Sequence, residues 1–173
     1  MVQGAKTDSG SSSREYGMAF EIPPPSAVRP GTPFTLPVIV AVRPVGNVRG
    51  SPTQQLVVNV SLRNEAGTDP VPGLSGTLTS SVRSRNGNTS NGYGRFSPLT
   101  IAQPGSYRLR VMLGAASASG VTTREYVDSG VIYVHGGAAP SQRPAPSQIS
   151  KLQSLIPENI DISAADIAAW QRA

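Results

Sequence analysis

The chain has no cysteine, which excludes disulfide bonds and thiolate metal sites from its 173 residues. It has one histidine, His135, which cannot by itself anchor a usual zinc site or form a Cys–His catalytic pair. The acidic residues are scattered, and Glu65 and Asp69, across a polar turn, form the only near pair in the strand region. We therefore predict no catalytic site, no metal and no cofactor.

Long apolar runs are also missing. No stretch is apolar for long enough to span a membrane, so we expect no membrane partner. Residues 1–13 are polar and lack the apolar core of a signal peptide, so we expect an intracellular protein. With 18 glycines and 16 prolines the chain is interrupted too often for long helices. This composition favours a mainly β protein, and the length suits one domain with tails.

Charged residues make up only 14% of the chain, and lysine is scarce among them. The formal net charge of +5 comes from thirteen arginines and two lysines against ten acidic residues. Twelve of the arginines and six acidic residues lie within residues 14–143, so the positive charge belongs to the predicted β region. Arginine-rich surfaces suit bidentate contacts with phosphate or carboxylate groups. The same charge also serves solubility alone, and composition leaves both interpretations open.

Two stretches, residues 56–63 and 106–113, alternate apolar and polar side chains. This period of two predicts half-buried antiparallel strands with one face on a core. The apolar side chains that would share that face are Leu56, Val58, Val60 and Leu62 in the first and Tyr107, Leu109, Val111 and Leu113 in the second. On the opposite face, Arg63, Arg108 and Arg110 would be solvated sheet residues.

Further strands are predicted from apolar content and turn signals between them. They cover residues 16–22, 34–42, 74–82, 96–101 and 121–135, with a break in the last at residues 128–130. Glycine-rich residues 83–95 are predicted to form a long loop, which the sequence assigns to neither end of the domain. The predicted organisation is a disordered segment at residues 1–15, a β domain at 16–136, a linker at 137–147 and a helical hairpin at 148–173.

The C-terminal residues change their period from two to that of a helix. A first short helix is predicted at residues 147–156, before Pro157, and a second opens at a capping box of Ser163 and Asp166. Each helix is too short to be stable alone, so the pair must dock on its own sheet or on a partner. The apolar side chains that would bind a partner are Leu152, Leu155, Ile167 and Trp170.

Several segments resemble, in order and in approximate spacing, successive blocks of the fungal velvet domain. The segments are LVVNVSLRNEAGTD at residues 56–69, LSGTLTSS at 74–81, RFSPLT at 95–100 and GSYRLRV at 105–111 with Leu113. Residues 20–22 and the proline-led residues 36–40 resemble the first two strands of that domain. The likeness therefore covers roughly residues 16–135.

The resemblance implies an immunoglobulin-like antiparallel β-sandwich, similar to the Rel-type DNA-binding domains of NF-kappa-B, with additional short helices. It also implies a regulator of fungal development and secondary metabolism, found in the nucleus and cytoplasm. Such a protein would bind DNA and form homo- or hetero-oligomers with another velvet-like protein. The chain departs from the family in two places: residues 23–35 offer only Arg29 where the family has a basic cluster, and residues 140–173 replace a basic C-terminal segment.

Three hypotheses follow. The first is a velvet-like regulator that binds DNA phosphates through loop arginines, which makes binding depend on salt. These arginines are Arg29, Arg43 and Arg49, expected at one end of the sandwich, and Arg83, Arg85 and Arg95, expected on the long loop. The second is an interaction module that dimerises with a related subunit and contacts DNA little. The third is an enzyme or small-ligand binder, whose pocket would be lined by Tyr93, Tyr107, Tyr133 or His135.

Overall fold

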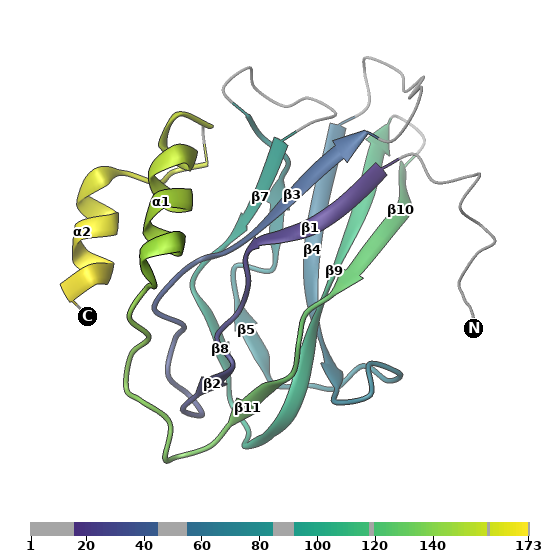
Figure 1. The fold of residues 1–173 in the computed structure, drawn as a ribbon. Helices are drawn as coiled ribbons and strands as arrows, with labels where there is room; N and C mark the ends of the chain where they lie inside the picture. The colour runs from purple at the N-terminus through teal and green to yellow at the C-terminus, as the bar shows by residue number, and fades with distance from the viewer. Residues whose placement is uncertain (1–15, 45–54, 85–91, 118–119, 159, 173) are drawn as a thin grey trace.

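The structure, a computed structural model, describes residues 16–44, 55–84, 92–117, 120–158 and 160–172. In these residues the chain is mainly β, with largely antiparallel sheets and two short helices (Figure 1). The mainly β class and the short C-terminal helices predicted from the sequence are therefore confirmed. Residues 1–15, which we expected to be disordered, lie outside the described residues.

The first sheet has three antiparallel strands in the order β1 (Tyr16–Ile22), β3 (Val38–Pro44) and β7 (Gly92–Phe96). The central position of β3 agrees with its sequence, because it is apolar on both faces. Val40 on one face lies in the main core, and Ile39 on the other lies in a second core beneath the helices. Pro37 precedes the strand, where its missing N–H removes no ladder hydrogen bond.

The second sheet has the order β2 (Ala27–Val28), β11 (Ile132–Val134), β9 (Gly105–Ser117), β4 (Gln55–Asn64) and β6 (Thr79–Ser81). Strand β10 (Gly120–Asp128) pairs with the same side of β9 as β11 does, further along it. Ser129 fills the break between them, and its backbone N–H donates to Leu109 O at 2.8 Å. The break predicted at residues 128–130 is confirmed.

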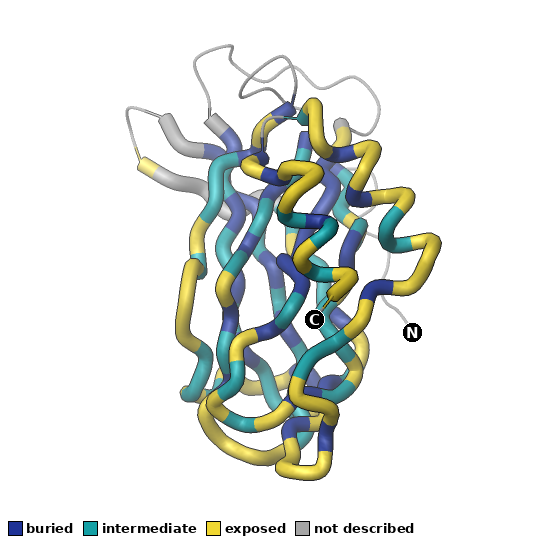
Figure 2. Tube along the Cα trace, turned by 90° about the vertical axis from the view of Figure 1, so that its left-hand side faces the viewer, coloured by how far each residue is buried: buried dark blue, intermediate teal, exposed yellow. Residues whose placement is uncertain are grey.

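The two sheets face each other across one main core, to which both contribute (Figure 2). All four apolar side chains predicted for the inner face of β4 are buried, with at most 4% exposed, and so are Leu109, Val111 and Leu113 of β9. Tyr107 is only partly buried, and its hydroxyl donates to the Gln103 and Pro104 carbonyls at 3.1 Å each. Period-two alternation therefore predicted this part of the core well.

Two predicted strands are each divided between sheets. Residues 74–82 form β5 (Leu74–Gly76), which pairs with β8 (Leu99–Ile101) in a small third sheet, and β6, which pairs with β4. Residues 96–101 are divided likewise, because β7 ends at Phe96 and β8 begins at Leu99. Gly76 sits at the first division with φ +118°, and a Cβ there would lie 1.9 Å from Pro98 O. Only glycine fits this position.

The prediction of a loop over residues 83–95 is wrong at its end, where Gly92–Phe96 is a strand. The glycines that indicated a loop serve close packing instead. A Cβ on Gly94 would lie 2.3 Å from Val58 Cγ2 of the opposite sheet, and one on Gly92 would lie 2.4 Å from Arg83 O. The chain thus needs glycine in a strand because other atoms approach closely.

Both predicted helices are present, as α1 (Pro146–Leu155), followed by the 3-10 turn η2 (Ile156–Glu158), and α2 (Ala164–Arg172). The predicted capping box is confirmed: Ser163 N donates to Asp166 Oδ2 and Asp166 N donates to Ser163 Oγ, each at 3.1 Å. The helix pair covers the outer face of the first sheet (Figure 1).

Candidate functional site

A hollow of about 160 Å³ lies where β6 meets β7, beside the connection between η2 and α2. Two arginines line it together with several hydroxyl side chains. We call it the arginine pocket, and it is lined by Thr77, Thr79, Ser80, Ser81, Arg83, Arg95, Ser97, Ile160 and Asp161. The pocket therefore brings together three segments that are distant in the sequence.

Backbone pairing places the two arginines on one face. Arg83 and Tyr93 exchange backbone hydrogen bonds of 2.9 and 2.8 Å, so they lie directly opposite each other. Side chains alternate along β7, and Phe96 faces the core, so Tyr93 and Arg95 face outward. Residues that lie directly opposite each other share a face, so the Arg83 side chain points outward as well. Arg95 is two residues beyond Tyr93, which makes it the diagonal neighbour of Arg83, at a typical separation of roughly 7–8 Å.

Neither guanidinium group has a hydrogen bond or an ion pair with the part of the chain that the structure describes. The Arg95 Nε is closed off from solvent and still has no acceptor there. Ser80 Oγ accepts a hydrogen bond from Arg95 N at 3.2 Å and donates one to Ser81 O at 3.1 Å. An unpaired buried donor costs free energy, and an anionic oxygen in the pocket would satisfy it.

Asp161 is the one acidic residue in the lining, and it lies on the connection that leads into α2. Its φ of 62° is the only positive value among the non-glycine residues that the structure describes. Aspartate tolerates this region better than most residues do. Its carboxylate makes no ion pair with Arg83 or Arg95 within the described residues, so it reduces the positive charge of the pocket without binding either arginine.

The remaining predicted arginines do not share one location. Arg43 is exposed at the last residues of β3, the end at which β7 begins, because Val42 pairs with Gly92. Arg83, which pairs with Tyr93, therefore lies at the Arg43 end as Gly92 does. Arg49 and Arg85 lie outside the described residues.

The grouping of Arg29 with Arg43 at one end of the domain is wrong. Arg29 follows β2, which pairs with β11 beside the first residues of β9, at the end opposite to Arg43 (Figure 1). Its Nε donates to the Ala138 carbonyl at 2.7 Å, which ties this turn to the segment before α1. The sequence could not reveal this, because β2 has only two residues and was not predicted.

The helix pair docks on the chain's own sheet, one of the two arrangements that the sequence left open. Of the four predicted partner-binding side chains, Leu152, Leu155 and Ile167 are buried, and Trp170 packs partly buried beside them. The helices contact Ile22, Ile39 and Tyr93 of the first sheet, together with Leu36, which precedes β3. These apolar side chains therefore fill the interior of the chain itself.

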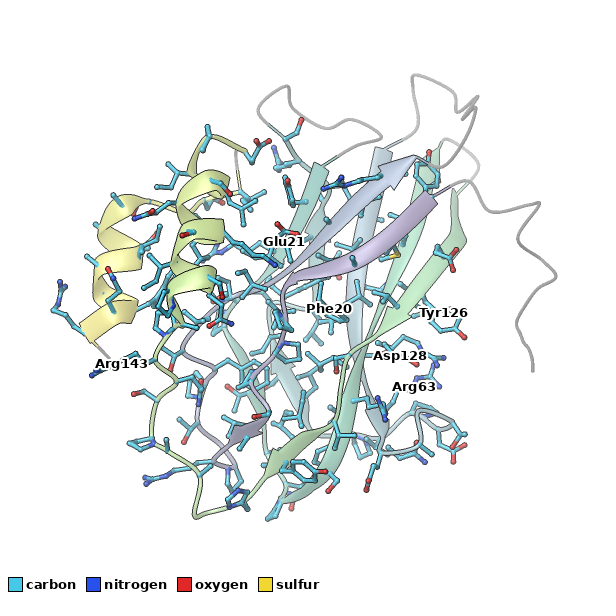
Figure 3. The ribbon with its side chains drawn as sticks, in the orientation of Figure 1. Phe20, Glu21, Arg63, Tyr126, Asp128 and Arg143 are labelled. Carbon is cyan, nitrogen blue, oxygen red and sulfur yellow. The ribbon has the colours of Figure 1, made fainter. Side chains whose placement is uncertain are left out.

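The outer face of β9 differs from the solvated face that the alternation predicted. Arg108 Nε donates to Glu65 O at 2.6 Å and its Nη1 donates to Ser129 O at 2.9 Å. Arg110 forms a bidentate pair with Asp128, at 2.8 and 3.0 Å, on the face where Figure 3 shows Asp128 and Tyr126. Both guanidinium groups thus hold the neighbouring turn and strand in place.

Sequence reasoning missed the hydroxyl lining and Asp161. The sequence held a signal for the hydroxyl groups, because every second residue from 75 to 81 is serine or threonine. Residues at this spacing share one face of a strand. No signal in the sequence joins Asp161 to this surface. His135, the only histidine, is exposed, and its Nδ1 accepts a hydrogen bond from Gly137 N at 3.2 Å.

None of the helices in the described residues is long and apolar enough to cross a membrane. Among the same residues, no group of three or more His, Asp or Glu side chains is placed to hold a metal ion. Comparison with models of known protein families finds none that matches the chain, and comparison with curated proteins finds no match either.

Proposed function

We propose that this chain is a velvet-like regulatory protein whose immunoglobulin-like β-sandwich binds the phosphates of DNA through the arginine pocket. The observation that carries the proposal is the pair Arg83 and Arg95, which share one pocket and whose guanidinium groups have no hydrogen bond or ion pair with the described residues. Arginine without a partner gains most from a ligand that supplies anionic oxygens, because charge-assisted hydrogen bonds are the stronger kind. The regulatory role in fungal development and secondary metabolism rests on the resemblance of the strand segments to the velvet domain.

Phosphate fits the chemistry of the lining better than a neutral ligand does. Guanidinium groups bind phosphate oxygens in a planar, bidentate geometry. The hydroxyl groups of Thr79, Ser81 and Ser97 can donate to further oxygens of the same group. Arg43, exposed at the same end of the domain, would meet a neighbouring phosphate of an extended backbone. Such contacts position a protein on DNA and carry no base sequence by themselves.

Dimerisation with a related subunit is the second candidate function, and it is supported by a different surface. Tyr126 on β10 is 52% exposed, and the Arg110 guanidinium lies over its ring at 4.1 Å from the centroid. Aromatic and arginine side chains are enriched at the centres of protein interfaces. Sedimentation velocity should then show a dimer that Tyr126→Ser weakens, whereas a monomer at all concentrations argues against this candidate.

Fluorescence anisotropy with a short labelled DNA duplex tests the phosphate proposal. We expect binding at low salt to weaken steeply between about 50 and 200 mM salt, as counterion release requires. Arg83→Gln with Arg95→Gln should lower the slope of log K against log salt by about two, one for each lost phosphate contact. Lys151→Gln with Arg172→Gln, which removes the same two charges from exposed positions on α1 and α2, is the control and should change the slope little.

Two results would contradict the proposal. One is the absence of binding at the lowest salt concentration. The other is an equal loss of affinity in the control that lacks Lys151 and Arg172 and in the variant that lacks Arg83 and Arg95, because affinity would then follow net charge alone and not the pocket. Thermal unfolding of each variant confirms that the comparison is made between folded proteins.

A further inference from the structure

A second hollow lies at the opposite end of the helix pair and has a different chemistry. It has a volume of about 260 Å³, and we call it the proline hollow. It is lined by Pro23, Pro24, Pro25, Ser26, Ala27, Leu36, Ala139, Gln142, Arg143 and Gln148. The lining contains none of the tyrosines that the sequence suggested for a ligand pocket. It also contains no acidic residue.

The side-chain amide of Gln142 is fixed in one orientation. Its Oε1 accepts a hydrogen bond from Thr35 N at 2.9 Å, and its own backbone N–H donates to Thr35 Oγ1 at 2.9 Å. A backbone N–H can only donate, so the amide cannot be flipped without breaking the first bond. The Nε2 is therefore fixed as a donor, and it is buried with no acceptor in the described part of the chain.

The side-chain amide of Gln148, in the first turn of α1, is also fixed in one orientation. Its Oε1 accepts a hydrogen bond from the backbone N–H of the N-cap residue Ala145 at 2.9 Å. Its Nε2 is thus also left as a donor. Arg143, the third nitrogen-bearing side chain of the lining, is exposed and carries a permanent positive charge (Figure 3). Two oriented amides and one guanidinium group therefore belong to the lining of one hollow.

The rest of the lining is largely apolar. The rings of Pro23, Pro24 and Pro25 form a rigid wall, and Leu36, Ala27 and Ala139 add aliphatic surface. Small-molecule sites commonly combine an apolar lining with a few oriented polar groups. The volume is slightly below the range of roughly 300–1,000 Å³ typical of drug-sized ligands, so the occupant must be small.

We propose that the proline hollow binds a small organic carboxylate, with its apolar part against the prolines and its carboxylate on Arg143 and Gln142. A carboxylate accepts from both N–H groups of a guanidinium fork and has lone pairs left for the amide. The buried Gln142 Nε2 would gain the acceptor that it lacks. The site is independent of the arginine pocket, and it stands whether or not the chain binds DNA.

Nuclear magnetic resonance of the full chain, labelled with nitrogen-15, tests this site directly. The probes are phenylacetate, its neutral amide, and a short N-acetylated peptide with a free C-terminal carboxylate. We expect phenylacetate to shift the side-chain amide signals of Gln142 and Gln148 and the neutral amide to leave them unchanged. The peptide distinguishes the two sources of a carboxylate, a free acid or a chain end, and shifts from either acid support the proposal.

Two variants make the test specific. Gln142→Glu keeps an oxygen for Thr35 N but replaces the donor with a second oxygen, which repels a carboxylate. Arg143→Gln removes the guanidinium fork. Each should weaken phenylacetate binding by about tenfold to a hundredfold, the range expected for a lost hydrogen bond to a charged group. Arg172→Gln is the control, and thermal unfolding verifies that every variant is folded.

Three results would overturn the proposal. In the first, neither acid shifts the signals of the two glutamines. In the second, the neutral amide binds as tightly as phenylacetate, which would leave the carboxylate without a role. In the third, inorganic phosphate shifts the same signals more strongly and with the same dependence on Arg143, which would assign the hollow to a different anion.

Discussion

Gly94 of β7 faces Val58 of β4 so closely that a Cβ on Gly94 would lie 2.3 Å from Val58 Cγ2. This contact joins the inner faces of the two sheets at a point where no side chain fits between them. The packed core cannot relax fully around an added methyl group, since protein interiors are already dense.

Gly94→Ala should therefore lower the free energy of unfolding by about 1–3 kcal/mol, the usual cost of overpacking. Combining it with Val58→Ala should cost less than the sum of the two single changes, because the second removes the methyl groups that clash. Urea denaturation of the four proteins measures this coupling. Additive effects would mean that the two residues do not compete for the same space.

Arg110 and Asp128 should be energetically coupled across β9 and β10. Their pair is bidentate and only partly exposed, with 16% and 27% of the two side chains accessible. A double-mutant cycle with Arg110→Gln and Asp128→Asn should give a coupling of about 1 kcal/mol, at the upper end for such pairs. A coupling near zero would show that the pair is as weak as a fully exposed one.

The titration of Arg110 should not change this coupling between pH 6 and pH 8. The hydrogen bond to Asp128 raises the pKa of Arg110 above its ordinary value, against an opposing effect of burial. A raised pKa in the folded state gives stability that is fully present below the unfolded-state pKa and is lost only as pH rises through the folded-state pKa. That range lies far above pH 8, so a loss of coupling on going from pH 6 to pH 8 would contradict this account.

The docking of the helix pair is tested by two neighbouring residues, the last of α1 and the first of η2. Leu155 is 1% exposed and Ile156 is 37% exposed. Leu155→Ala should lower the free energy of unfolding by about 2–5 kcal/mol, as the removal of a buried leucine usually does. Ile156→Ala is the matched control and should cost much less. Equal and small effects in urea denaturation would argue against docking on the first sheet.

Asp161 should oppose anion binding in the arginine pocket. Asp161→Asn removes the one carboxylate of the lining while keeping a residue that tolerates positive φ. We expect DNA affinity at low salt to rise about threefold, from the removal of a repulsion of roughly 0.5–1 kcal/mol at high dielectric. Anisotropy measures this change, and unchanged affinity would place the bound phosphate away from Asp161.

Much of the fold could be predicted from the sequence where neighbouring residues determine the structure. Leu56, Val58, Val60 and Leu62 alternate with polar residues, and this local pattern predicted their buried face. The capping pair Ser163 and Asp166 was predictable for the same reason, since its two members lie three residues apart.

The candidate site was less predictable because long-range contacts determine it. Arg95 was assigned to a loop because Gly92 and Gly94 are typical of loops, whereas close approach of Val58 and Arg83 requires them in a strand. The pocket then depends on the pairing of Arg83 with Tyr93 and on Asp161 from the helical region. No spacing within the sequence encodes these contacts.

The segment that contains β6 and Arg83 has a further consequence for how partners can bind. Residues 79–81 pair with β4, and Val82 N donates to Leu56 O of the same strand. Arg83 then pairs with Tyr93 of β7, so the segment connects the second sheet to the first along one side. At this border the backbone groups of Arg83 and Tyr93 are paired with each other, and Arg95 N donates to Ser80 Oγ, so a visiting chain cannot add a strand at these residues. Recognition along this border must therefore be made by side chains, so substitutions of surface side chains can alter it without rebuilding the framework.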